Sequence, residues 1–318
     1  MAPWEFTAEA ARNKCVISIP MGNGKMEQFS VWRVAMLDAE FAAACPYLLT
    51  YAGVSLADSR RSVRFSTTLR GFRAMVMQPD FGTAMIQPVS PGKPNSLYLV
   101  YDHADAPDDG QIAFQTGMTP NGTVWFGNDG KRFAPPAEDR GQELDPVQLK
   151  VFRFCVAAVG EFTQDHGGTK PLALSAVTEY TNLVSAIFER DIDLRLQLTA
   201  ATQYVMFTNP DTDPYPGPGN EDYMSQNPAV LNQYTNLNSH DLGHVFIRGG
   251  GGVAGGYACL ASKGRGCSAG SLVSSNNYGD RFLYVIGQEV GHQVGGSHSW
   301  NFCGDLGNTN RYSGTAYE

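Results

Sequence analysis

The chain has 318 residues, of which 42% are hydrophobic and 17% are charged, so it is long enough to bury the cores of about two domains. Its formal net charge is −8 and it has no run of lysine and arginine, which argues against nucleic acid or an anionic membrane surface as a partner. No stretch reaches the roughly 18 apolar residues that a membrane-spanning helix needs, and the first residues do not have the pattern of a signal peptide.

The first hundred residues are typical of short β-strands. Residues 63–69 alternate between apolar and polar or small side chains, Gly71 supplies a turn, and residues 72–76 alternate again, which predicts a hairpin. Similar runs predict strands at residues 16–19, 29–34, 85–86 and 97–101. From His103 to Asp145 the sequence is rich in Asp, Gly and Pro, so we expect a mostly β domain with a linker that ends near residue 145.

The second half, residues 146–318, alternates strands and helices. A buried-looking strand at residues 151–159 precedes a helix at residues 171–190, whose apolar side chains recur with helical spacing. Strict alternation at residues 192–198 predicts a strand with one buried face, and residues 242–247 predict another short strand. Strand–helix–strand order with mixed connections predicts an α/β layer fold.

Two of the six cysteines, Cys259 and Cys267, lie close together in a Gly/Ser-rich stretch. A local disulfide and two isolated buried thiols are both compatible with this spacing. No CxxC motif occurs, which argues against a structural zinc knuckle.

A last helix is expected from about Arg281 to Val294, with Asp280 as its N-cap and Gly295 as its left-handed stop. The residues at its end resemble the pattern H-E-x-x-H-x-x-G-x-x-H, in which two histidines four residues apart face one metal ion. A glutamate beside the first histidine acts as general base on the metal-bound water, and a third histidine completes the ligand set.

Four of the five fixed positions match this pattern: Glu289, His292, Gly295 and His298. The first histidine is replaced by Gln288, whose amide oxygen is neutral and a poorer zinc donor than imidazole. Two histidines with a weak third ligand should hold zinc less tightly. The replacement therefore favours weak or absent catalysis, with a tolerated substitution as the alternative.

Other stretches strengthen a resemblance to one family. They are residues 29–32, 51–53, 188–192, 241–246 and 249–255. With the helix motif, they resemble the reprolysin-like, adamalysin-related bacterial metallopeptidases of the metzincin clan, and the resemblance covers almost the whole chain. It implies a metzincin-like α/β (α+β) catalytic domain with a mixed twisted sheet, preceded by a β-rich propeptide. Since no methionine follows Met224, we expect the domain to stop before the methionine turn of that clan.

The resemblance also implies roles for particular residues. Glu289 would be the general base, His292 and His298 would bind Zn²⁺, and Gln288 would occupy the degenerate ligand position. An extended peptide or protein substrate would pair with an edge strand formed by Leu242, Gly243, His244, Val245 and Phe246. His244 itself is more typical of a hydrogen-bonded structural histidine than of a ligand. The propeptide would contact the catalytic domain within the chain, and secretion is expected from the family.

Two other classes of function compete with a peptidase. A catalytically inactive pseudopeptidase that binds peptides or proteins is favoured by Gln288. A purely structural β-rich module would require the metal motif to be accidental.

Overall fold

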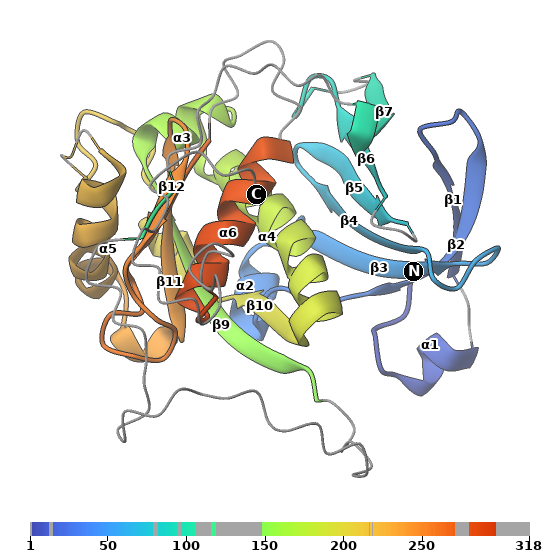
Figure 1. Cartoon of the computed structure of the whole chain (residues 1–318), viewed down its shortest axis with the longest axis horizontal. Coiled ribbons are helices and arrows are strands. Elements are labelled where there is room, and N and C mark those ends of the chain that lie inside the picture. The colour runs from blue at the N-terminus through green and yellow to red at the C-terminus, as the bar shows by residue number, and fades with distance from the viewer. Residues whose placement is uncertain are drawn as a thin grey trace, which may run out of the picture.

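The computed structural model describes residues 2–12, 15–78, 82–93, 97–105, 116–118, 148–215, 217, 219–270 and 280–296. None of the helices in these ranges combines the length and apolar character needed to cross a membrane. Two β-sheets face each other across a layer that contains the helices α4 and α6 (Figure 1).

The first sheet is an antiparallel meander in which seven strands pair in chain order. The strands are β1 (Cys15–Pro20), β2 (Met26–Arg33), β3 (Leu49–Ser55), β4 (Ser62–Thr68), β5 (Gly71–Met77), β6 (Thr83–Pro88) and β7 (Tyr98–Asp102). The short helices α1 (Ala8–Arg12), α2 (Ala39–Ala44) and η2 (His103–Asp105) accompany it. The predicted hairpin is confirmed, because β4 and β5 pair through Thr68 and Gly71.

The second sheet is mixed and has the order β10-β9-β11-β13-β12-β8. Its strands are β8 (Thr116–Met118), β9 (Lys150–Ala158), β10 (Leu194–Leu198), β11 (Leu242–Arg248), β12 (Gly252–Ala254) and β13 (Gly266–Gly270). Strands β10, β9, β11 and β13 are parallel, and β12 is antiparallel to β13. This arrangement confirms the predicted α/β fold with a mixed sheet. The predicted domain boundary near residue 145 lies outside the described residues and stays a prediction.

Helices cover both faces of the second sheet. On one face α4 (Lys170–Ile192) packs on β10 and α6 (Asp280–Gln293) packs on β12 and β13. On the other face α5 (Asn220–Tyr234) packs on β11 and β13, as Figure 1 shows at the left. The remaining helical segments are α3 (Gly160–Asp165), η3 (Ala200–Val205) and η4 (Leu237–Ser239).

The sequence predicts α4 well and α5 not at all. In α4, Pro171 stands in the first turn and Asp193 ends the helix with a φ of 52°. The predicted strand at residues 192–198 therefore begins two residues later, at Leu194. In α5, Pro228 and a mostly polar sequence hide the helical period, so no helix is predicted there.

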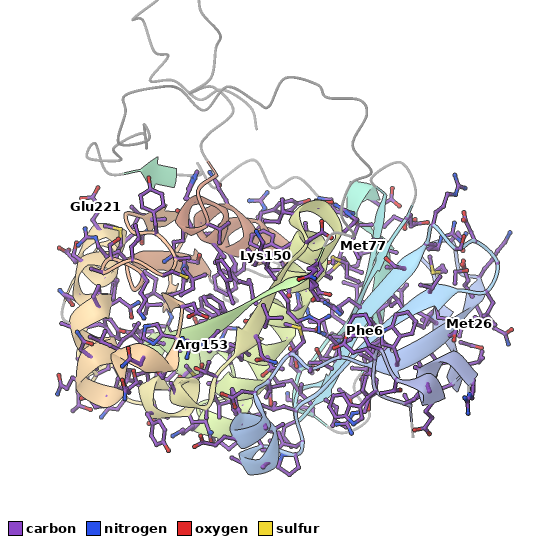
Figure 2. All side chains as sticks on the ribbon, turned by 90° about the horizontal axis from the view of Figure 1, so that it is seen from below. Phe6, Met26, Met77, Lys150, Arg153 and Glu221 are labelled. Carbon is purple, nitrogen blue, oxygen red and sulfur yellow. The ribbon has the colours of Figure 1, made fainter. Side chains whose placement is uncertain are left out.

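One continuous apolar core joins the two sheets. It contains Met36, Phe41 and Met77 from the first part of the chain together with Phe154 and Leu183 from the second. Figure 2 shows side chains filling this junction, with Met77 at its border and Met26 and Glu221 near opposite ends of the molecule. A second core cluster lies within the first sheet alone.

The cysteines of the described residues are not paired. Cys267 is buried in β13, whereas Cys259 is exposed in a turn. The local disulfide between them is therefore not formed, and the alternative of separate thiols is correct, although only Cys267 is buried. Cys303 lies outside the described residues.

Candidate active site

The predicted last helix is confirmed as α6, and its end has a defined geometry. The N–H of Gly296 donates to the carbonyl of Gly291 at 2.8 Å, and the N–H of Gly295 donates to that of His292 at 3.0 Å. With Gly295 at a φ of 103°, this pair of bonds is a Schellman motif. The glycine that ends the helix thus turns the chain sharply back after His292.

The same turn orients the imidazole of His292. Its Nδ1 lies 2.8 Å from the carbonyl oxygen of Gly296. A carbonyl only accepts, so Nδ1 carries the hydrogen and Nε2 carries the lone pair of the neutral ring. Histidines that bind metals through one nitrogen generally donate the other N–H in this way. The helix stop therefore sets both the direction and the tautomer that a metal ligand at His292 needs.

Glu289 lies fully buried beneath β12. A Cβ added to Gly252 would stand 2.4 Å from the Cγ of Glu289, which is closer than any two such atoms approach. Only glycine at this position leaves room for the carboxylate side chain under the strand. Gly252, the last glycine of the run and the first residue of β12, thus has a packing role that the sequence alone did not reveal.

Gln288 is half-buried, and its buried Nε2 has no hydrogen-bond partner among the described residues. The two ends of an amide exchange places by rotation, so the oxygen can take this position. Residues four positions apart lie on one face of a helix, so Gln288 and His292 are on the same side of α6. The third predicted ligand, His298, lies outside the described residues, and the described part of the chain contains no cluster of three His, Cys, Asp or Glu side chains suited to a metal.

The prediction that residues 242–246 form an edge strand is wrong. Strand β11 pairs with β9 on one side and with β13 on the other, and its residues Leu242, Gly243, His244, Val245 and Phe246 are all buried. No open side of β11 remains for a peptide to join. The strand beside Glu289 is β12. On the side away from β13, it pairs in parallel with β8, through Thr116 to Met118.

His244 is a structural residue in the middle of this sheet. Its Nδ1 lies 2.7 Å from Oε1 of Gln293 and its Nε2 lies 2.8 Å from Oγ of Ser268. Gln293 in turn donates to the carbonyls of Gly243 at 3.0 Å and Lys263 at 3.3 Å. Burial lowers the pKa of His244 to about 4, so the ring is neutral at pH 7.

This network fastens the last turn of α6 to β11 and β13. Gly266 makes room for it, because a Cβ there would stand 2.3 Å from Oε1 of Gln293 and 2.5 Å from Nδ1 of His244. Sequence reasoning identified His244 as structural but did not identify Gln293, Ser268 or Gly266 as its surroundings. Gln293 occupies a variable position of the metal motif, so the motif gave no signal for it.

Helix α6 carries an acid and an imidazole and packs on the antiparallel strand of a mixed sheet, which is the arrangement that the metallopeptidase motif predicts. Residues 148–317 match the family described as metallo-peptidase family M12B, reprolysin-like. This match spans more than half of the chain, and the chain belongs to that family. A search of curated proteins found no match to this chain. Metallopeptidases of family M12B depend on zinc in general and act on peptides.

Proposed function

We propose that this chain is a zinc-dependent endopeptidase homologue in which His292 and His298 bind Zn²⁺, Gln288 stands at the first ligand position of the motif and Glu289 is the general base. The observation that carries the proposal is the hydrogen bond from Nδ1 of His292 to Gly296, because it directs the lone pair of Nε2 away from the helix stop. Glu289 lies one turn before His292 on the same helix, which suits an acid–base group beside that ligand.

The chemistry follows from these positions. Zinc, when bound, supplies a Lewis acid that polarises the peptide carbonyl and lowers the pKa of a water molecule. The carboxylate of Glu289 accepts a proton from the attacking water and returns it to the nitrogen of the leaving amine.

Peptide binding in this proposal takes place along β12 and not along β11. Main-chain hydrogen bonds to a sheet margin give affinity for an extended peptide of any sequence. Strand β8 already pairs with that margin, opposite Gly252, Val253 and Ala254 of β12. We therefore extend the proposal to the first part of the chain, residues 1–145, which would act as a propeptide that contacts the catalytic domain and covers the margin of β12.

The alternative function is that of a pseudopeptidase that binds peptides without cutting them. Gln288 favours it, because a neutral amide ligand weakens the site for zinc. The same β12 margin would then hold a peptide or a partner protein, and Glu289 would have no chemical role.

The two functions are separated by Gln288→His. Zinc content, measured by inductively coupled plasma mass spectrometry, and cleavage of a quenched fluorescent peptide library are compared for the natural chain and the variant. If the natural chain cleaves peptides and His292→Ala abolishes this cleavage, the peptidase function is supported. Zinc binding and cleavage that arise only with histidine at position 288 support the pseudopeptidase. Inactivity of both, with zinc bound by neither, would reject the zinc site.

Secretion belongs to the same proposal and is supported by the family resemblance alone. Expression from the complete natural gene, followed by detection of the protein in the culture medium, tests it. Retention of all the protein inside the cells would contradict it.

A further inference from the structure

Helix α4 is buried on every side, which is unusual for a helix with polar residues. Every residue from Ala173 to Ala186 is buried, including Ser175, Glu179 and Asn182. A helix at the surface of a domain buries one apolar stripe and exposes its polar residues. Ser175 donates to the carbonyl of Pro171 in the same helix, whereas Glu179 and Asn182 lie beneath the first sheet, with which α4 packs chiefly through β4 (Figure 1). The first sheet therefore has to supply partners for Glu179 and Asn182.

Two polar residues of α4 receive specific partners from the first sheet. The carboxylate of Glu179 accepts from Nε of Arg70 at 3.1 Å and from Oγ1 of Thr68 at 2.5 Å. The side chains of Arg70 and Glu179 are only 4% and 3% exposed, so this pair is held away from water. The amide of Asn182 donates to the carbonyl oxygen of Phe65 at 2.9 Å. These contacts are specific to two groups of the first sheet, the backbone carbonyl of Phe65 and the charge of Arg70.

A second buried group of charges crosses the same interface. Arg195 of β10 binds both Glu189 of α4, at 2.8 Å from Nε, and Glu5 of the N-terminal segment, at 2.5 Å from Nη1. Arg64 of β4 also donates to Glu189. Two arginines and two glutamates thus alternate, and each part of the chain contributes one of each sign. Hydrogen bonds from Arg195 and the charges of Arg64 and Arg195 outweigh burial and hold the pKa of Glu189 below its ordinary value.

Backbone pairing and apolar packing complete the interface. The segment after β2 lies along the outer edge of β10, where the N–H of Leu198 donates to Met36 at 2.7 Å and the N–H of Asp38 donates to Leu198 at 2.9 Å. The first part of the chain thereby pairs with the last residue of this edge strand. Apolar side chains of that part enter the main core of the second, namely Val34, Met36, Leu37, Phe41, Leu48, Met75, Met77 and Met85.

We propose that α4 and β10 form a docking surface for residues 2–105, so that the first sheet remains bound as a noncovalent subunit when the chain between residues 119 and 147 is cut. Release of the first sheet would expose the apolar residues named above and leave Glu179 without Arg70. An interface that combines a shared apolar core with buried, oriented ion pairs resembles a permanent complex and not a transient one. This inference goes beyond the peptidase proposal and does not depend on it.

The test uses the full chain with a recognition site for a highly specific protease inserted between Gly130 and Lys131. The protein is cut to completion, diluted to about 1 μM and passed over a size-exclusion column with light scattering. We expect the two fragments to elute together with the mass of the uncut chain and an unchanged circular dichroism spectrum. Elution of two separate fragments from the cut protein would overturn the proposal.

A matched pair of variants tests the surface itself. Arg70→Met removes the buried partner of Glu179, whereas Arg60→Met removes an ion pair with Asp58 in the connection between β3 and β4, where Arg60 is 73% exposed. After cutting, we expect Arg70→Met to raise the dissociation constant of the fragments at least about tenfold, and Arg60→Met to leave it unchanged. Asn182→Ala, which removes the bond to Phe65, provides a second variant with the same expected direction. Equal dissociation constants for all of these proteins would refute the proposed surface.

Discussion

The Nδ1 atom of His244 lies 2.7 Å from the side-chain oxygen of Gln293, and this bond joins the centre of the second sheet to the last turn of the helix that carries His292. Because the Gln293 nitrogen donates to two carbonyls, its oxygen is the acceptor and His244 Nδ1 carries the hydrogen. Nε2 then accepts from the hydroxyl of Ser268. Each buried polar group of this network has a partner, so removal of any member leaves others unsatisfied.

Gln293→Ala should therefore destabilise the protein by about 2–4 kcal/mol, since it leaves the buried N–H of His244 without its acceptor and removes the bonds from Gln293 to the carbonyls of Gly243 and Lys263. Gln288→Ala is the matched control, because that glutamine lies on the same helix but its buried amide nitrogen has no partner among the described residues. Urea unfolding followed by circular dichroism measures both. A cost for Gln293→Ala no larger than that for Gln288→Ala would contradict the role of the network.

Two glycines near Glu289 should respond to alanine in opposite directions. In Gly252→Ala the new methyl group would collide with Glu289, so we expect a loss of about 1–3 kcal/mol and displacement of the carboxylate. In Gly287→Ala the methyl group meets nothing within 4 Å, and alanine is the better helix former, so a gain of up to about 1 kcal/mol is expected. Melting temperatures by differential scanning calorimetry test both. Stabilisation by Gly252→Ala would show that β12 lies elsewhere.

The sequence predicts the helices and strands of this fold better than it predicts which strands lie side by side. Helices α4 and α6 have apolar residues at helical spacing and clear end signals, and both were predicted nearly in full. Strand β11 was predicted as a strand but wrongly placed at an edge. Its neighbour β13 comes from a glycine-rich stretch without apolar alternation, so nothing in the local pattern shows that a strand lies there.

The candidate site shows the same limit. A motif read along one helix predicted Gln288, Glu289 and His292 as site residues, because its spacing depends only on the helical period, and α6 does carry all three. Gln293 was not identified, because its partner His244 lies 49 positions earlier in the chain. Contacts between distant segments arise from the topology of the sheet, which short-range patterns do not contain.

Thiol reactivity should separate the cysteines of the described residues. Cys259 is exposed, whereas Cys155 and Cys267 are buried. Burial raises the pKa of Cys155 to about 12 and raises that of Cys267 as well, so neither forms the reactive thiolate in the folded protein. We expect iodoacetamide to modify Cys259 at least about a hundredfold faster than either, as measured by peptide mapping, because the buried thiols react only after the structure opens. Comparable rates at Cys259 and Cys267 would show that β13 is not packed as described.

Acid should destabilise the protein because three buried histidines are neutral in the folded state. Burial lowers the pKa of His244 and of His240 to about 4, and it lowers that of His166 well below its ordinary value. In the unfolded chain each ring titrates near its ordinary pKa of about 6.5. Between pH 6.5 and 4 the unfolded state therefore binds more protons than the folded state, and stability falls as the pH falls.

The size of this effect can be measured directly. Each histidine that stays neutral costs about 1.4 kcal/mol of stability per pH unit in that window. Urea unfolding at several pH values between 7 and 4.5 gives the number of protons taken up on unfolding. His240→Asn should lower that number by about one, because the asparagine does not titrate. A free energy of unfolding that stays constant from pH 7 to 5 would mean that these rings take up protons in the folded protein as readily as in the unfolded chain, and therefore that their surroundings are not the buried ones described.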